Sequence, residues 1–411
     1  MTDATSRART LILFSVAYFL SYFFRSANAV LAPDLARTFS LGAADMGLMT
    51  SLFYAAFVLV QIPLGVALDR FGARWVTSGL MLVGAVGCAV FAAADTFVSL
   101  AIGRALIGAG MGGVLMGALK AISQRFPPQR AVTVSGWVIA IGASGALVAA
   151  TPLSWFNHNF GWRAVFLAGA AVTALTAMVL MAWAPGVPTG LAREPRGGEP
   201  AMRLVFSDRR FWRIALLAFT MTGTMLGFQG LWVGPYLFDA EQVSESVGAN
   251  LILVLGLSVV AGYAVSGWMA DRWGLARVVA VAASAFGLCQ VCLALHPPRL
   301  ALALLFVVFG FCGAFSVTLL SHSRKVFPGA VSGQALTAAN LFAIGGTFIL
   351  QWMIGLVVGA FPRDAAGQYP ALAYSAALGM TALALGATLA FYIPLTRESD
   401  AGNAESSTPP A

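Results

Sequence analysis

The chain has 411 residues, of which 59% are hydrophobic and only 10% are charged, and its net charge is +8. Soluble domains are about 45–50% apolar and about 25% charged, so this composition excludes a water-soluble globular protein. Apolar runs of about 20 residues, the length of helix that crosses a hydrocarbon core about 30 Å thick, recur along the whole sequence. The runs do not alternate apolar and polar residues as barrel strands do. We therefore expect an all-α membrane protein, because a helix satisfies its own backbone hydrogen bonds in lipid.

Twelve transmembrane helices are predicted, six in each half of the chain. The first six cover residues 11–32, 46–68, 75–94, 98–123, 131–153 and 163–183. The second six cover residues 212–236, 247–269, 277–295, 299–322, 331–358 and 371–394. The intervening segment is rich in Pro, Gly and Arg and has no apolar period, which is typical of a linker. We expect a six-helix bundle over 1–185, a cytoplasmic linker over 186–210, a second bundle over 211–396 and a disordered cytoplasmic tail over 397–411.

The basic residues predict the orientation of these helices. With both termini in the cytoplasm, 17 Arg and Lys residues lie on the cytoplasmic side, and four lie outside: Arg37, Arg163, Arg299 and Arg363. Such a bias is the positive-inside pattern of membrane proteins. It accounts for the net positive charge, so no nucleic-acid partner is expected. Arg outnumbers Lys 22 to 2, which suggests a bacterial source and hence the cytoplasmic (inner) membrane.

Metal, cofactor and enzyme chemistry have little support in the sequence. All four cysteines lie in apolar segments; Cys289 and Cys292 form one C-x-x-C pair, without a second pair or a histidine at metal spacing. We interpret them as buried apolar side chains. No nucleophile–base pair is apparent, so we expect neither an enzyme, a metal nor a cofactor. A cleaved signal peptide ending near Ala27-Asn28-Ala29 is an alternative for the first helix, but cleavage would break the following repeat.

The chain contains an internal repeat. Gly65, Asp69, Arg70 and Gly72 of "GVALDRFGAR" recur 202 positions later as Gly267, Asp271, Arg272 and Gly274 of "GWMADRWGLAR". Two parallel six-helix repeats, related by an axis along the membrane normal, are one architecture of membrane transporters. We infer that a six-helix unit has been duplicated.

The repeated segment resembles the loop signature G-x-L-A-D-R-x-G-R-[RK] of the major facilitator superfamily. Gly65, Asp69, Arg70, Gly72 and Arg74 match it, whereas the residues at 67 and 73 depart from it. "GRALIGAG", residues 103–110, is similar to the family's fourth-helix motif. The resemblance implies a transporter with two pseudo-symmetric halves that works by alternating access.

The motif residues are candidates for the gate between access states. A glycine at 65 permits close helix approach, and a carboxylate at 69 can latch one state through a helix N-terminus or through arginines of the other half. The alternative is a turn that carries only positive-inside charge. The predicted gating residues are Gly65, Asp69, Arg70, Gly72, Arg74, Arg104, Gly267, Asp271, Arg272 and Gly274.

The first helix carries a polar stripe with a deep arginine. Tyr18, Ser21, Tyr22, Arg25 and Asn28 follow helical i, i+3, i+4 and i+7 spacing. Arg25 lies 14 residues past the start of the helix, about 21 Å at 1.5 Å per residue, too deep to reach the interface easily. A charge at that depth faces protein or a watery cavity, so we expect Arg25 to bind an anionic substrate. The alternative is an arginine that bonds backbone carbonyls for structure.

Polar residues on other helices complete the predicted cavity. Gln229 and Trp232 repeat the spacing of Tyr22 and Arg25, offset by 207 positions. Helices 2, 5 and 11 also carry polar faces, including Tyr54 on helix 2. The alternative for Arg104 is a charge at the helix end that reaches the outer interface. Lys120 is about 160° away on the same helix, and its alternative is a side chain that reaches the cytoplasm. The predicted substrate-binding residues are Tyr18, Tyr22, Arg25, Asn28, Gln61, Trp137, Gln229, Trp232, Asn340 and Gln351.

These observations predict a secondary transporter of a small organic anion. The stretch "RSANAVLAP" resembles the first helix of the anion:cation symporters, but Met111 occupies the place of their helix-4 Glu, and none of the 16 acidic residues is at mid-membrane. A proton or an exchanged anion is therefore the expected coupling partner, and a monomer in the lipid bilayer is expected. The alternative is a proton-driven exporter of drugs or other amphipathic compounds; a membrane receptor with the same fold is less favoured.

Overall fold

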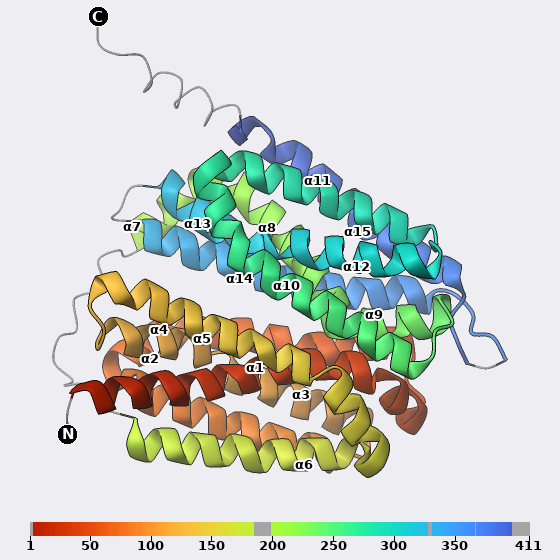
Figure 1. The fold of residues 1–411 in the computed structure, drawn as a ribbon, viewed down its shortest axis with the longest axis horizontal. Helices are drawn as coiled ribbons and strands as arrows, with labels where there is room; N and C mark the ends of the chain where they lie inside the picture. The colour runs from red at the N-terminus through yellow and green to blue at the C-terminus, as the bar shows by residue number, and fades with distance from the viewer. Residues whose placement is uncertain (1–2, 185–198, 328–330, 366, 397–411) are drawn as a thin grey trace, which may run out of the picture. The chain divides into compact units, whose positions relative to one another are not determined.

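The computed structural model describes residues 3–184, 199–327, 331–365 and 367–396, and these residues form helices and connecting turns with no strand (Figure 1). Within the described residues, ten helices are long and apolar enough to span a membrane, and a shorter apolar helix covers Val134–Val148. One of the ten, the 50-residue α2, is bent and supplies two of the predicted spans. The predicted tail and residues 186–198 of the predicted linker lie outside the described residues.

The first half of the chain forms α1 to α6. Their bounds are α1 Asp3–Phe39, α2 Ala43–Ala92, α3 Phe97–Met111, α4 Val114–Ser123, α5 Pro128–Val148 and α6 Thr151–Trp183. Predicted helices 2 and 3 are the two arms of α2, which part at Gly72, where φ is 80° and ψ is 158°. The predicted fourth helix is α3 followed by α4. The first arm of α6, before Gly161, was not predicted as a separate segment.

The second half contains the remaining helices and two π-helical segments. Their bounds are α7 Glu199–Ser207, α8 Arg209–Gly227, η1 Phe228–Trp232, α9 Val233–Pro235, η2 Tyr236–Ala240, α10 Glu245–Trp273, α11 Leu275–Ala294, α12 Arg299–Ala314, α13 Ser316–Val326, α14 Ser332–Gly359 and α15 Ala371–Tyr392. The predicted seventh helix is the continuous run from α8 to η2. The helix α7 falls in the predicted linker, and its Val205 is buried in a core with Phe211 and Ala335.

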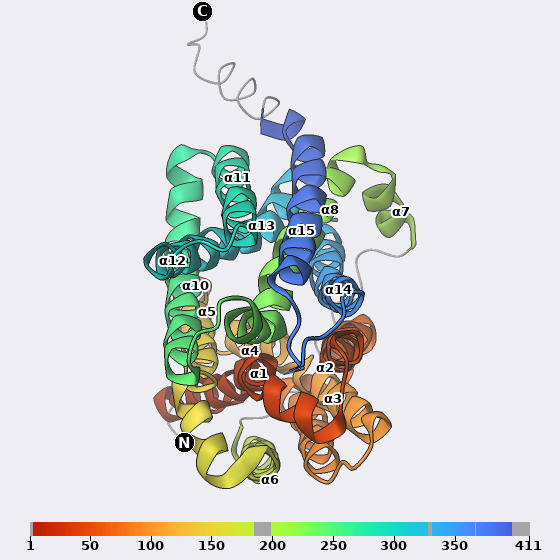
Figure 2. The same ribbon diagram turned by 90° about the vertical axis from the view of Figure 1, so that its right-hand side faces the viewer.

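Contacts divide the chain into two compact units. The N-terminal unit comprises the described residues of Met1–Glu194 with Gln229–Phe238 and Val243–Leu253. The C-terminal unit comprises those of Pro195–Phe228, Asp239–Gln242 and Val254–Ala411. In the N-terminal unit α3 packs on α2 and α5 packs on α1; in the C-terminal unit α14 packs on α8 and α11 on α15 (Figure 2).

The outward-facing surfaces of the helices are apolar. Val66 is 69% exposed, Leu300 is 89% exposed and Leu383 is 77% exposed. Apolar exposure on this scale is unusual on a water-soluble monomer. Lipid tails cover such surfaces at no hydrophobic cost, so these faces agree with helices that span a membrane.

Candidate functional site

The polar stripe of α1 is buried inside the N-terminal unit. Tyr18, Ser21, Tyr22, Arg25 and Asn28 are each at most 9% exposed. The guanidinium carbon of Arg25 lies 4.8 Å from the centroid of the Tyr22 ring. It also lies 5.3 Å from the centroid of Phe57 on α2. A desolvated cation over aromatic faces gains about 2 kcal/mol, which helps to hold the Arg25 head group in the interior.

The two ends of the stripe are fixed by neighbouring helices. Asn28 donates from Nδ2 to the Thr50 hydroxyl on α2 over 3.0 Å. Its Oδ1 is buried without a hydrogen-bond partner among the described residues. The Tyr18 ring meets the Tyr22 ring edge-on, with 5.1 Å between centroids, and occupies the space beside Gly142 of α5.

Arg104 on α3 is fully buried, with 0% exposure. Its Nη1 donates to the backbone carbonyl of Phe24 over 2.8 Å, and its guanidinium lies 4.9 Å from the Phe53 ring centroid. Its Nε and Nη2 have no hydrogen-bond partner in the part of the chain that the structure describes. Arg104 therefore does not reach the surface, which was the alternative for this residue.

Glycines in the same motif explain how an arginine becomes this deeply buried. A Cβ at Gly108 would lie 2.1 Å from the Phe53 carbonyl oxygen, and one at Gly110 would lie 2.3 Å from the Gly84 nitrogen. These contacts are possible only without a side chain, so α3 lies directly against α2. Because Arg104 is one helical turn before Gly108, it faces the same interface.

Tyr54 on α2 connects the two arginines. Its side chain is 1% exposed, and it interacts electrostatically with both Arg25 and Arg104. The Tyr54 hydroxyl has no hydrogen-bond partner among the described residues. Two buried cations, a phenol and an amide thus lie in the interior of the N-terminal unit, on α1, α2 and α3. The buried donors of Arg104 and Tyr54 that lack a partner among the described residues cost about 1–3 kcal/mol each, and anionic ligand oxygens would accept hydrogen bonds from them.

Other predicted substrate residues have different surroundings. Gln229 and Trp232, in η1 of the N-terminal unit, are 9% and 2% exposed; close by in the chain, Gly234 packs against the Ala29 carbonyl on α1. Gln61 is half-buried and Trp137 is exposed. In the C-terminal unit, Gln351 is buried and donates to the Gly227 carbonyl over 3.2 Å, and Asn340 is half-buried. The place of these six side chains in one pocket stays a prediction.

The repeated loop motif forms matching breaks in the two halves. Gly72 and Gly274 have φ values of 80° and 86°, in the left-handed region that glycine adopts without steric cost. Asp69 forms an ion pair with Lys120 on α4. Arg74 donates from Nε to the Met181 carbonyl at the end of α6.

The remaining gate residues lie at the surface of their units. Arg70, Asp271 and Arg272 are exposed. A Cβ at Gly65 or Gly267 would find no atom within 4 Å, so the close approach expected at Gly65 is not made within the N-terminal unit. The gating role of the motif stays a prediction.

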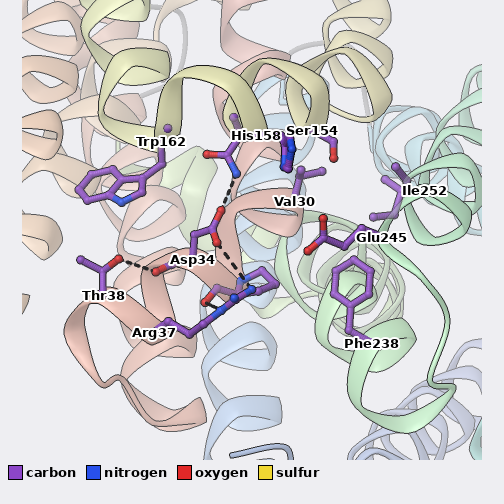
Figure 3. Close-up of a pocket in the computed structure, with 14 residues that line it drawn as sticks. Val30, Asp34, Arg37, Thr38, Ser154, His158, Trp162, Phe238, Glu245 and Ile252 are labelled. Atoms are coloured by element: carbon purple, nitrogen blue, oxygen red, sulfur yellow. Dashed lines mark hydrogen bonds and ion pairs between the residues drawn. The ribbon is translucent and has the colours of Figure 1, made fainter.

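A polar cavity of about 540 Å³ lies further along α1 (Figure 3). Asp34 in its wall accepts a hydrogen bond from Asn157 on α6. Its Oδ1 lies 3.7 Å from Nη2 of Arg37. Glu245 and His158 also line it. Asp34 is nine residues beyond Arg25, about 13 Å at 1.5 Å per residue. The described part of the chain has no group of three or more His, Cys, Asp and Glu side chains that would hold a metal.

A family model described as the Major Facilitator Superfamily matches residues 14–349. The chain belongs to the Major Facilitator Superfamily. The family indicated by the repeated loop signature is thus confirmed, and with it the all-helical fold of twelve spans in two halves. The relatives found within it are transporters rather than enzymes.

Three relatives are similar to this superfamily member over most of its length. A gentisate transporter of Corynebacterium glutamicum is 24% identical over 365 residues, 84% of this chain and 81% of the relative. A hexuronate transporter of Bacillus subtilis is 25% identical over 260 residues, 61% of each chain. An uncharacterized transporter of the same bacterium, YybO, is 24% identical over 279 residues, 63% of this chain and 64% of the relative. The chain thus spans less than two thirds of two of these relatives.

Solved structures support the same fold. A bacterial homologue of the human lysosomal transporter Spinster, in an inward-facing and occupied conformation, has a TM-score of 0.75 and 20% identity. The match covers 95% of this chain and 97% of that one. At this identity the likeness shows the fold alone.

Proposed function

We propose that this superfamily member is a secondary transporter of small organic carboxylates that works by alternating access. The observation that carries the proposal is the pair of buried guanidinium groups, Arg25 and Arg104, which both interact electrostatically with the buried Tyr54. Arginine presents several N–H donors in a planar fork that matches a carboxylate. An anion is the ligand that offsets two positive charges in the membrane interior.

The names of the relatives agree with this substrate class. Gentisate, hexuronate and 3-(3-hydroxy-phenyl)propionate, the printed substrates of three relatives, are all carboxylates. Each also carries hydroxyl groups, which suit amide and phenol partners such as Asn28 and Tyr54. We infer that one arginine binds the substrate carboxylate, and that Gln229, Trp232 and the other predicted pocket residues contact the remainder.

The polar cavity beside Asp34 fits the role of an access vestibule. It is lined by residues of α1 beyond Arg25, towards the end of α1 that the proposed orientation assigns to the outside. Two carboxylates, Asp34 and Glu245, line it, but Asp34 is partly neutralised by Arg37. An entering anion therefore meets both signs of charge before it reaches Arg25.

Import needs a driving force, because moving one negative charge inward against about 100 mV costs about 2.3 kcal/mol. Symport with at least one proton or exchange for an internal anion meets this requirement. The proposal therefore includes a coupling ion, and the membrane is the bacterial cytoplasmic membrane with both termini inside.

Uptake of radiolabelled gentisate and galacturonate into proteoliposomes tests the role of Arg25. Arg25→Ala is expected to reduce uptake at least thirtyfold, because loss of a buried charge-assisted contact costs about 2–5 kcal/mol. Arg25→Lys keeps the charge but not the fork, so we expect it to retain partial uptake. Arg9→Ala, at an exposed arginine of the same helix, is the matched control. Full uptake by Arg25→Ala would remove Arg25 from the mechanism.

A binding assay covers the case in which neither compound is taken up. Thermal-shift measurements with a panel of hydroxylated carboxylates are expected to identify one that stabilises the wild type but not Arg25→Ala. Resistance of an expressing strain to several unrelated amphipathic toxins, with no carboxylate binding, would favour export instead.

A further inference from the structure

A second polar cluster lies in the C-terminal unit, at the end of the continuous helical run from α8 to η2. Glu241 follows η2, His296 follows α11, and Ser375 is in the first turns of α15. The Glu241 carboxylate lies 2.9 Å from Nδ1 of His296. Nε2 of the same ring lies 2.8 Å from the Ser375 hydroxyl oxygen. That hydroxyl donates to the Ala294 carbonyl over 2.6 Å.

The hydrogen bonds that link Glu241, His296 and Ser375 require an extra proton. A carbonyl oxygen only accepts, so the single hydroxyl hydrogen of Ser375 is used on Ala294. Nε2 of His296 must then donate to the Ser375 oxygen. With Nε2 protonated, the Nδ1 contact to Glu241 needs one more hydrogen, either on Nδ1 or on the carboxyl group. In both cases the pair holds one proton more than a neutral histidine beside a carboxylate.

Burial and backbone conformation set this pair apart from an ordinary surface contact. The side chain of Glu241 is 9% exposed and that of His296 is 27% exposed. His296 has a φ of 51°, and Gln242, next to Glu241, has a φ of 50°. A left-handed conformation costs a non-glycine residue about 1–2 kcal/mol. Such outliers persist where surrounding contacts enforce them, often at functional sites.

The neighbouring groups attach the same chain segment to α15. Asp239 at the end of η2 accepts a 2.6 Å hydrogen bond from the Tyr374 hydroxyl and one from the Tyr369 backbone. Gln242 donates to the Asp239 carbonyl and to Gln368. The other titratable or charged groups at this end are Arg299, which begins α12, and Arg363 and Asp364, which interact electrostatically with Asp239.

We propose that Glu241 and His296 form a proton-binding site. This site controls how the end of η2 is attached to the ends of α11 and α15. With the proton bound, the segment after η2 is held to the ends of α11 and α15. When the proton leaves, one ring nitrogen of His296 loses its hydrogen bond, either Nε2 to the Ser375 oxygen or Nδ1 to the Glu241 carboxylate. Histidine is the side chain that ordinarily exchanges its proton between pH 5 and 8.

The helical run from α8 to η2 is suited to respond to the loss or gain of this proton. It contains two π-helical segments, η1 and η2, and π-helical turns are frequent at functional sites. Its segment η1 carries Gln229 and Trp232, two predicted substrate residues. The inference rests on the proposed function for its consequence in transport, since it supplies a protonation site to a chain whose sequence has no acidic residue at mid-membrane. The proton site itself is testable without any substrate.

Nuclear magnetic resonance of the full chain in detergent micelles, with ¹⁵N- and ¹³C-labelled histidine, reads the site directly. The sequence has three histidines, so His158→Gln and His296→Gln assign the signals. We expect Nε2 of His296 to carry a proton in the wild type, because the Ser375 hydroxyl hydrogen is used on the Ala294 carbonyl. In Glu241→Gln the proton affinity of His296 is expected to fall about tenfold or more, because an adjacent carboxylate favours the charged ring. The His158 signal serves as the internal control and stays unchanged.

Ser375→Ala provides a milder second variant if Glu241→Gln does not fold. We expect it to weaken proton binding by His296 and to speed amide hydrogen exchange in residues 236–242 several-fold, measured at one pH against the wild type. A His296 ring without a proton on Nε2 in the wild type would overturn the proposal, as would equal proton affinity in the wild type and the folded variants. Arg25→Ala is expected to leave the His296 titration intact, so failure of the substrate site and failure of the proton site give different results.

Discussion

At the scale of single residues, the N-terminal unit is marked by two buried arginines, Arg25 and Arg104. Arg104 uses one of its five N–H donors on a protein carbonyl, and its Nε and Nη2 lack partners among the described residues. A buried cation with unmet donors is costly in the membrane interior. Its cost is offset by the aromatic faces around it and, in the proposed function, by the substrate anion.

Tyr54→Phe tests whether the phenol faces the ligand. The Tyr54 hydroxyl has no hydrogen-bond partner in the described structure, so its removal is expected to leave the melting temperature unchanged or slightly higher. Carboxylate affinity is expected to fall about tenfold, since a hydrogen bond to a charged group contributes about 1.5–3 kcal/mol. Isothermal titration and thermal unfolding measure the two effects.

The same change at Tyr392 is the matched control. The Tyr392 hydroxyl is 2.7 Å from Nδ1 of His322 inside the C-terminal unit. Tyr392→Phe is expected to lower the melting temperature and leave carboxylate affinity unchanged. Equal carboxylate affinity in Tyr54→Phe and the wild type would place Tyr54 outside the binding site.

At the scale of elements, close helix packing through glycine positions the site. Gly108 brings α3 against the backbone of α2, and the Arg104 guanidinium lies over the ring of Phe53 on α2. On the C-terminal side, Gly346 of α14 makes a comparable approach to the Phe219 carbonyl of α8. Small residues at helix interfaces permit such approaches, and in membranes van der Waals packing is a main source of helix association.

Gly108→Ala is expected to destabilise the N-terminal unit. The added Cβ would lie 2.1 Å from the Phe53 carbonyl oxygen, and overpacking typically costs about 1–3 kcal/mol. Gly79→Ala, on α2 where an added Cβ meets no atom within 4 Å, is expected to be neutral or stabilising by up to about 1 kcal/mol. Thermal unfolding in detergent compares the two. Equal stability in both variants would contradict the close packing described for α2 and α3.

At the scale of the whole molecule, the charge distribution predicts how the chain is oriented in a bilayer. Seventeen basic residues lie on the side assigned to the cytoplasm and four on the other side. The exposed apolar side chains cover the lengths of the helices between them. This arrangement predicts that the breaks at Gly72 and Gly274 face the cytoplasm, together with both termini.

Reporter fusions test this orientation. Green fluorescent protein fused at either terminus is expected to fluoresce, because it folds in the cytoplasm but not after export through the general secretory route. Alkaline phosphatase inserted after Pro297, in the predicted outer loop, is expected to be active, whereas an insertion after Gly274 is expected to be inactive. Active phosphatase at Gly274 would reverse the orientation and with it the assignment of the polar cavity as an outer vestibule.

Hydropathy and the repeated motif were sufficient for the architecture, because both are local properties. Each span needs about 20 apolar residues, and the turn at Gly72 needs only a glycine at one position. The burial of the α1 stripe also followed from helical spacing. The linker helix α7 was missed because its apolar residues pack on Phe211 and Ala335, far along the chain.

The surroundings of the arginines depended on packing between helices. The pairing of Arg104 with the Phe24 carbonyl joins residues 80 positions apart, and no periodicity predicts it. A partial signal was present, since Arg104 and Gly108 share the tightly packed face of one helix. The chain from Glu241 through His296 to Ser375 likewise joins three separate segments, over separations of 55 and 79 positions. Helical period specifies which face of a helix is buried, but only the packed bundle specifies which side chain of another helix meets it.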